Sequence, residues 1–164
     1  MRKRKNIHER IDSNIRLIDS PLCNNCIAKL YYDENEHLKY GFGSLFPKII
    51  IVLPPRAYNN RIYDNYIKEI FKDIVDLKYE YITYHPKCKC DVNVDDYINK
   101  CSQFLLHEIN KLKPNIIIFF GVKIPQQLFD ANVDFKLYYF KDIYSITFND
   151  NELNIFREQI KKIL

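Results

Sequence analysis

The sequence predicts a three-layer α/β sandwich with a central, mostly parallel sheet of four strands. Short, continuous apolar runs alternate along the chain with segments in which apolar residues recur at helical spacing. Such alternation is typical of βαβ units, whose parallel strands are covered by helices on both faces. Hydrophobic residues make up 47% of the 164 residues, which is enough for one packed core.

The first expected elements surround a glycine turn. Isoleucines at helical spacing over residues 7–18 predict an amphipathic helix that ends at Ser20-Pro21. Residues 40–44 hold two of the three glycines of the chain, so a turn of special backbone geometry is expected there. The apolar run 48–53 has the composition of a central strand, and Pro54 and Pro55 end it.

The middle of the chain continues the alternation. A helix is expected over residues 62–74, with Asn59 or Asn60 as its N-cap, and a second strand over residues 79–84. Asp95 or Asp96 can cap the next helix. Its apolar face is formed by Ile98, Cys101, Leu105, Ile109 and Leu112.

The C-terminal third supplies the remaining strands. Residues 115–120 predict a strand that is apolar on both faces, and a short helix follows near residues 124–129. Residues 136–140 and 143–148 predict one or two further strands. Asp150 is expected to cap a last helix with Leu153, Phe156, Ile160 and Ile163 on its buried side.

Charge is concentrated at the N-terminus. Residues 1–16 hold six of the 25 basic and two of the 21 acidic residues, so the rest of the chain is neutral. Residues 1–21 therefore predict a basic arm with a helix, and residues 22–164 the domain. The arm residues Arg2, Lys3, Arg4 and Lys5 can contact phosphate or an acidic partner, although a solvated tail explains them equally well.

The cellular compartment is predicted from the absence of an apolar membrane span and of a signal peptide in this sequence. No apolar run is long enough to span a bilayer, which takes roughly 18 residues, and the basic start has no apolar segment behind it. We therefore expect a cytoplasmic protein without membrane contact, in the host cytoplasm if it is viral. In that reducing environment, closely spaced cysteines are more often metal ligands than disulfides.

Five cysteines form the clearest functional pattern. Cys23 and Cys26 have the spacing at which one turn points two thiolates at one metal, and Cys88 and Cys101 follow the second strand and enter the next helix. Four thiolates suit Zn²⁺ or an iron–sulfur cluster equally by ligand type. A zinc site would more naturally use Cys88 with Cys90 and leave Cys101 as a small core residue.

The order of these motifs resembles the iron–sulfur type of uracil-DNA glycosylases. That family begins with a Cys-x2-Cys motif, continues through a Gly-x-Gly turn and a Lys-Cys motif, and ends its pattern with a strand followed by Gly. The matching residues are Cys23, Cys26, Gly41, Gly43, Lys48 to Val52, Ile82-Thr83, Lys87-Cys88, Cys101, Phe104-Leu105, Glu108-Ile109, Leu112, Pro114, Ile116-Ile117 and Gly121.

The resemblance covers roughly residues 22–164 and implies a fold, a cofactor and a partner class. It implies a uracil-DNA glycosylase-like domain with a structural [4Fe–4S] cluster on Cys23, Cys26, Cys88 and Cys101, with zinc as the alternative metal and Cys90 as the alternative ligand.

The catalytic motifs of the family are replaced. The family's Gly-Glu-x-Pro-Gly reads Leu53-Pro54-Pro55-Arg56-Ala57, so its carboxylate is missing, and only Tyr58 roughly corresponds to the aromatic that stacks on the flipped base. Its Ile-Thr-Asn ends in Tyr84, whose ring can fill the pocket. Its Thr-x-His-Pro reads Thr147-Phe148-Asn149-Asp150.

These replacements define the functional hypotheses. We expect a non-catalytic member of the superfamily that binds DNA or a protein of a replication, transcription or repair complex. The alternatives are an active DNA glycosylase with a rebuilt site, for which His85, Asn149 and Asp150 are the candidate residues, and a zinc-stabilised interaction domain. His85 lies in a Thr-x-His-Pro sequence, but that sequence precedes Lys87-Cys88, so we take the match as coincidence.

Overall fold

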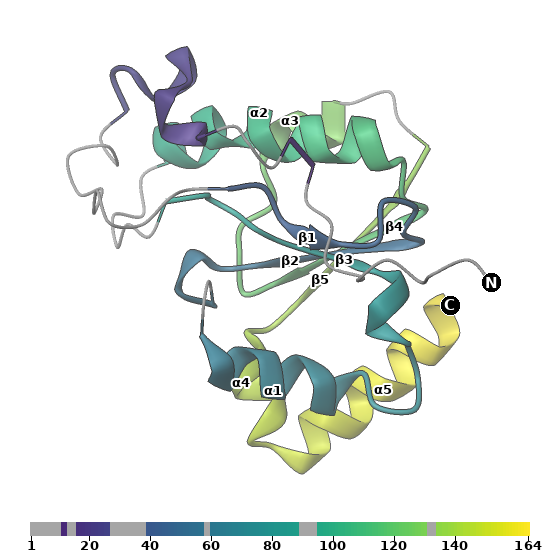
Figure 1. Cartoon of the computed structure of the whole chain (residues 1–164). Coiled ribbons are helices and arrows are strands. Elements are labelled where there is room, and N and C mark those ends of the chain that lie inside the picture. Colours follow the sequence, from purple (N-terminus) through teal and green to yellow (C-terminus); the bar gives the residue numbers. More distant parts are fainter. Residues whose placement is uncertain (1–10, 13–15, 27–38, 58–59, 89–94, 131–133) are drawn as a thin grey trace.

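The computed structural model describes residues 11–12, 16–26, 39–57, 60–88, 95–130 and 134–164. It has one five-stranded sheet in the order β1-β3-β2-β4-β5, flanked by helices (Figure 1). The strands are β1 (Phe42–Gly43), β2 (Ile49–Leu53), β3 (Tyr81–Tyr84), β4 (Ile116–Phe120) and β5 (Lys136–Phe140). The α-helices are α1 (Arg61–Ile70), α2 (Asp95–Leu112), α3 (Gln126–Asp130), α4 (Ile143–Thr147) and α5 (Asp150–Ile163). Short 3-10 helices are η1 (Leu17–Asp19), η2 (Pro21–Cys23), η4 (Pro55–Ala57) and η5 (Leu77–Tyr79).

The predicted α/β class is confirmed, but the sheet has five strands rather than four. Strands β3, β2, β4 and β5 are parallel, and the short β1 pairs antiparallel with β3. The sequence predicted only a turn at β1. The glycine there permits the pairing: Gly43 has φ +137°, and a Cβ on it would clash with the backbone oxygen of Glu80.

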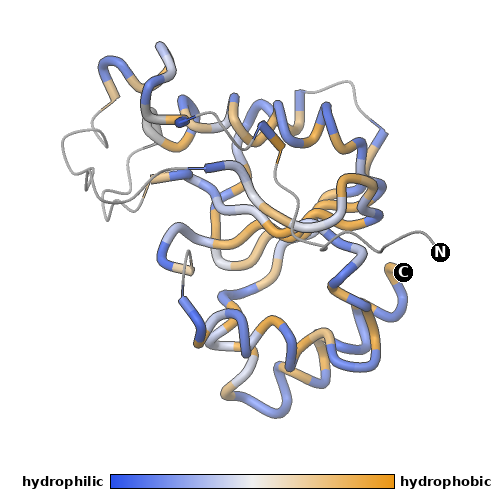
Figure 2. Tube along the Cα trace, viewed as in Figure 1, coloured by the Kyte–Doolittle hydropathy of each residue, from blue (hydrophilic) through white to orange (hydrophobic). Residues whose placement is uncertain are grey.

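The helices form one layer on each face of the sheet. Helices α2 and α3 cover one face, and α1, α4 and α5 cover the other (Figure 1). Ile50 and Val52 of β2 pack into the core under α2, whereas Ile49, Ile51 and Leu53 pack into the core under α1. The central strands β2 and β4 are correspondingly apolar along their length in Figure 2, while the helices expose hydrophilic residues outward.

Most of the periodic segments fold as predicted. The strands β2, β3 and β4 lie inside the predicted ranges, and all five residues predicted for the apolar face of α2 are buried. Asn60 caps α1, because its side chain accepts a hydrogen bond from the backbone N–H of Ile62. Among the described residues, no helix combines the length and apolarity that crossing a membrane requires.

Of the one or two strands predicted over residues 136–140 and 143–148, the first is confirmed as β5, but Ile143–Thr147 form helix α4, so a strand in the second range is wrong. Asp142 accepts a hydrogen bond from the backbone N–H of Tyr144 and starts the helix, and Ile143 and Ile146 point into the core three positions apart. The cap of α5 is also one residue earlier than predicted. Asn149, not Asp150, accepts from the N–H groups of Asn151 and Glu152.

The prediction for the N-terminal segment is also wrong, and the helix predicted over residues 62–74 ends earlier, at Ile70. The predicted helix over residues 7–18 is absent from its described part, where Ile11 and Asp12 form a turn and Leu17–Asp19 forms a 3-10 helix. Asp12 has φ +46°, a backbone conformation that does not continue a helix. In α1 the buried residues are Tyr63, Ile67 and Ile70, which leaves Ile62 57% exposed.

Candidate functional site

The carboxyl ends of β2, β3, β4 and β5 meet at one edge of the sheet, because these strands are parallel. After β2 the chain adds β3 on one side and then crosses to β4 on the other side of β2. In open α/β sheets, ligands bind beyond the carboxyl ends at such a reversal of strand order. The edge therefore defines the candidate functional site.

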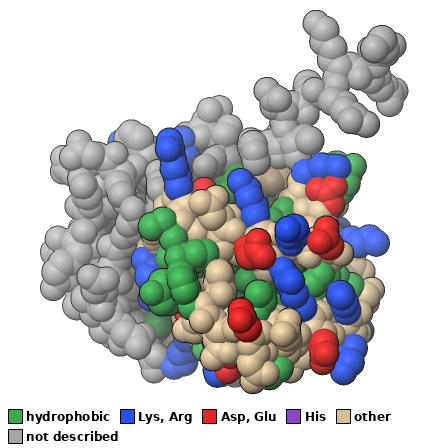
Figure 3. Space-filling view, turned by 90° about the horizontal axis from the view of Figure 1, so that it is seen from below, with side chains coloured by type: hydrophobic (Ala, Val, Ile, Leu, Met, Phe, Trp, Pro, Cys, Tyr) green, Lys and Arg blue, Asp and Glu red, His purple; other side chains and the backbone are tan. Residues whose placement is uncertain are grey.

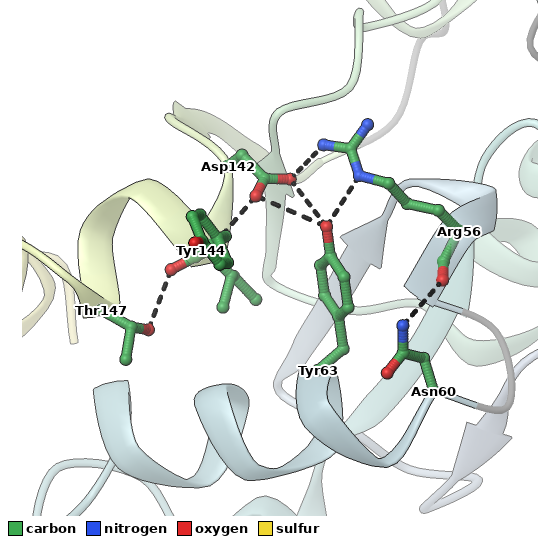
Figure 4. Close-up of polar contacts among 7 residues, drawn as sticks. Arg56, Asn60, Tyr63, Asp142, Tyr144 and Thr147 are labelled. Carbon is green, nitrogen blue, oxygen red and sulfur yellow. Dashed lines mark hydrogen bonds and ion pairs between the residues drawn. The ribbon is translucent and has the colours of Figure 1, made fainter.

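An arginine, a tyrosine and an aspartate converge at this edge from three elements (Figure 4). Arg56 of η4 donates from Nε to the hydroxyl of Tyr63 on α1 at 2.7 Å, and from Nη2 to Oδ2 of Asp142 at 2.5 Å. The Tyr63 hydroxyl is also 3.4 Å from Asp142 Oδ2. Arg56 stays 60% exposed, whereas Asp142 is only 18% exposed. The half-buried aspartate thus holds an exposed guanidinium in a fixed position.

The surroundings of Asp142 support this position. Gly121, which follows β4, has φ +62°, and a Cβ on it would lie 2.9 Å from Cβ of Asp142. The hydrogen bond from Arg56 to Tyr63, followed by the ion pair with Asp142, raises the pKa of Arg56. Burial is the main cause of the raised pKa of Tyr63. The cluster therefore consists of a permanent cation, a protonated phenol and a carboxylate.

His85 directly follows β3, and its side chain is fully buried. It is 0% exposed, and neither ring nitrogen has a hydrogen-bond partner among the described residues. Burial, with a smaller contribution from the positive charge of Lys87, lowers its pKa to about 3. The imidazole is therefore neutral at physiological pH.

The other predicted site residues are spread over different environments. Pro54 is buried and Pro55 half-buried, and Tyr84 is 4% exposed in the core under α1. Asn149 is exposed and is occupied as the cap of α5, and Asp150 is exposed in its first turn. The described hydrogen bonds do not join either of them to His85. Tyr58 and residues 2–5 lie outside the described residues.

Four cysteines from distant parts of the sequence pack into one core under α2. Cys23, Cys88 and Cys101 are buried there, Cys26 is partly buried and packs against the same core, and none of the four is in a disulfide. The Sγ of Cys23 donates to the carbonyl of Leu17 at 3.3 Å. Cys90 lies outside the described residues, so the choice between Cys90 and Cys101 as a ligand stays open.

The thiols suit a metal in kind, but they are not arranged as a finished site. Among the described residues, no group of three or more His, Cys, Asp or Glu side chains is placed to hold a metal ion. Burial is the main cause that raises the pKa of Cys101 to about 12, and the nearby Cys23 and Cys26 contribute to this rise. A metal would have to displace this thiol proton and draw the sulfurs together.

A buried ion pair, which the sequence interpretation did not single out, lies beside the cysteines. Lys87 Nζ is 2.7 Å from Glu108 Oε2, and the two side chains are 1% and 0% exposed. Lys87 also donates from its backbone N–H to Sγ of Cys101 at 3.2 Å. The pair thus adjoins the thiol of Cys101.

Glu108 joins three further groups from distant parts of the chain. It accepts from the backbone N–H of Gly41 at 2.6 Å, from the hydroxyl of Thr83 at 2.8 Å and from that of Tyr81 at 3.2 Å. A sequence signal existed for its burial, because Glu108 falls on the apolar face of α2 between Leu105 and Leu112.

No protein-family model matches this sequence, and no curated protein is similar to it at a significant level. The site must therefore be interpreted from its own geometry.

Proposed function

We propose that this protein is a non-catalytic, uracil-DNA glycosylase-like binding subunit of a nucleic-acid-processing assembly. Its partner would be DNA or a protein of a replication, transcription or repair complex, and its location cytoplasmic, in the host if the protein is viral.

The observation that carries the proposal is that the candidate catalytic residues at and near the carboxyl edge have separate structural roles. Base excision needs a pocket for the extruded base, a positioned water and a group that stabilises the leaving base. At this edge Tyr84 and His85 are buried, and the exposed side of η4 presents the Arg56–Asp142 ion pair. Asn149 is committed to capping α5. The residues that would have to rebuild a catalytic site are therefore in separate structural roles, which favours binding over catalysis.

The cysteines support a structural role for a metal centre. A [4Fe–4S] cluster on Cys23, Cys26, Cys88 and Cys101, or zinc as the alternative, would cross-link the N-terminal segment to the β3–α2 region. The chain contributes the thiols and a backbone N–H from Lys87 directed at Cys101 Sγ. The Lys87–Glu108 pair would keep that donor in place.

The decisive experiment is a lesion-panel assay on anaerobically purified protein. Duplexes and single strands that carry uracil or other damaged bases are incubated with the protein and cleaved with alkali, with an active glycosylase as positive control. We expect no strand breaks above background. Lesion-dependent breaks would refute the proposal, and their loss in His85→Leu would assign the reaction to this edge.

Metal analysis of the same sample separates the two metal alternatives. Iron with acid-labile sulfide supports the cluster, and zinc alone supports the alternative. A well-folded protein with neither metal would contradict the structural role of the cysteines.

A further inference from the structure

Strand β5 forms one edge of the sheet, and among the described residues no strand pairs with its outer side. The strand order ends at β5, which pairs with β4 alone. Lys136 and Tyr139 are exposed, and the other three residues of β5 are half-buried. The opposite edge is formed by β1, which is only two residues long. In the described part of the chain, β5 is therefore the longer open edge.

The peptide groups of alternate residues in β5 point to opposite sides of the strand. The backbone N–H of Lys136 donates to the carbonyl of Asn115 at 2.9 Å, so residue 136 faces β4. Residues 138 and 140 face β4 as well, whereas the N–H and C=O groups of Leu137 and Tyr139 point away from it. None of these four groups has a hydrogen-bond partner among the described residues. They form a row that another extended chain can pair with along its length.

The composition of β5 does not protect this edge. Proteins usually blunt an open edge with a very short strand, a proline, a bulge or a charged side chain. The two-residue β1 follows that rule, but residues 137–140 read Leu-Tyr-Tyr-Phe, and the nearest charges are Lys136 and Lys141 at the two ends. Tyr139 is 57% exposed. Aromatic residues favour strands and are enriched at protein interfaces, so β5 has the composition of a strand that pairs further.

A second apolar surface lies on the layer of α1, α4 and α5. Figure 3, which views this layer from below, shows hydrophobic side chains among charged side chains of both signs. Helices satisfy most of their peptide groups internally, so this layer does not specify the conformation of a partner. The edge of β5 does specify it, because its unpaired peptide groups require a β-strand.

We propose that two copies of this chain associate through β5, antiparallel and about a two-fold axis at Tyr138, so that their two sheets become continuous. In this register Leu137 of each copy lies opposite Tyr139 of the other copy, and each pair exchanges two N–H···O=C hydrogen bonds. All outward peptide groups of Leu137 and Tyr139 are then satisfied. A register shifted by two residues leaves part of each strand without a partner.

The side chains also match in this register. Lys136 lies opposite Phe140 of the second copy, so its ammonium group meets an aromatic ring instead of another lysine. Tyr138 lies opposite Tyr138 of the second copy, an aromatic pair of the kind that stabilises antiparallel sheets. Outside residues 1–16 the chain has no net charge, so the two domains do not repel each other through their overall charge. The sequence of β5 is thus complementary to itself, which favours a second copy over a strand of another protein.

Sedimentation velocity of the full-length protein, over a range from about 1 to about 200 μM, tests the association. Two five-residue strands bury a small area, so we expect a reversible dimer with a Kd on the order of 10 μM. Tyr139→Pro removes an outward N–H group but no hydrogen bond to β4, and it should weaken the dimer at least about 10-fold. Tyr139→Thr, the matched control, keeps that N–H group and should weaken the dimer less. Circular dichroism verifies that both variants are folded.

Disulfide cross-linking tests the register. Tyr138→Cys places two thiols at the two-fold axis in a non-hydrogen-bonded pair, where the Cα atoms are about 4.5 Å apart and a disulfide can form. Tyr139→Cys alters a more exposed position that does not face itself across the axis. After mild oxidation we expect a disulfide between the two copies of Tyr138→Cys, identified by mass spectrometry, and much less cross-linking in Tyr139→Cys. The wild type, oxidised in parallel, accounts for the native cysteines.

A wild type that stays monomeric over the whole concentration range would overturn the proposal. So would a Tyr139→Pro variant that dimerises as well as the wild type, or equal cross-linking by the two cysteine variants. A monomeric chain that pairs β5 with a strand of another protein would overturn it as well. The lesion-panel assay is independent of these results, because pairing through β5 requires neither glycosylase activity nor its absence.

Discussion

Replacing Glu108 by Gln is the sharpest test of the buried network. The substitution keeps the shape of the side chain and an oxygen for the Gly41 N–H, but it removes the negative charge beside Lys87. The ammonium group of Lys87, 1% exposed, then keeps the Thr83 hydroxyl and the face of the Tyr40 ring as described partners, and neither carries a negative charge. We therefore expect a strong loss of stability caused by one uncompensated buried charge.

The magnitude follows from the burial of both partners. Removing one member of a fully buried ion pair costs about 3–5 kcal/mol, which is a large part of the roughly 5–15 kcal/mol by which a domain is stable. For a chain of this size the same change corresponds to a fall in Tm of about 10 °C. A double variant, Lys87→Met with Glu108→Leu, should regain most of the loss, because neither charge is then buried.

Urea unfolding at matched metal content measures these differences by linear extrapolation, and a constant m value shows that the unfolded state is unchanged. Glu158→Gln serves as control, since Glu158 is exposed and its replacement should change the unfolding free energy by less than about 0.5 kcal/mol. A loss below about 1 kcal/mol in Glu108→Gln would refute the reasoning. So would a double variant as unstable as the sum of its single variants.

Three further predictions concern the cysteines, the carboxyl edge and the buried histidine. Cys101→Ser should lose metal while Cys90→Ser retains it, as measured by metal analysis after anaerobic purification; the reverse result would assign Cys90 as the ligand. Gly121→Ala should lower the unfolding free energy by about 1–3 kcal/mol, because Gly121 has φ +62° and an added Cβ would lie 2.9 Å from Cβ of Asp142; unchanged urea unfolding would contradict this close contact. The pKa of His85 in the folded protein is about 3, below the ordinary 6.5. Between these two pH values the unfolded chain binds a proton at His85 that the folded chain does not bind. The folded protein is therefore destabilised as the pH falls from 6.5 towards 3. Between pH 6 and 4.5 the unfolding free energy of the wild type should therefore fall relative to His85→Leu by about 1.4 kcal/mol per pH unit, and parallel pH profiles would show that His85 is not buried in neutral form.

The layer architecture was predictable because local pattern and tertiary environment agree in the central elements. The run Ile49–Leu53 is apolar on both faces because both faces are buried, and α2 buries the stripe that its periodicity indicates. The hydrophobic pattern gave a wrong prediction where the segment was short. Residues 143–148 contain β-branched and aromatic residues that favour a strand, but the Asp142 cap and the Ile143–Ile146 spacing produce a helix.

The candidate site was less predictable, because its contacts join residues far apart in sequence. Arg56 was visible as a residue at a strand end, but its partner Asp142 lies 86 positions away and carries no motif. Glu108 was noted only as part of the family resemblance. Its role depends on Lys87, Thr83 and Gly41 meeting it in space, which no single-sequence periodicity encodes.

The buried ion pair also constrains how this sequence can evolve. A single change at position 87 or 108 leaves one charge stranded in the core, whereas a joint change to two apolar residues does not. An evolutionary change from the ion pair to two apolar residues therefore passes through a single variant of low stability. We expect distant homologues to differ at both positions together or at neither. Covariation of these two positions would therefore identify homologues whose cysteine spacing has changed.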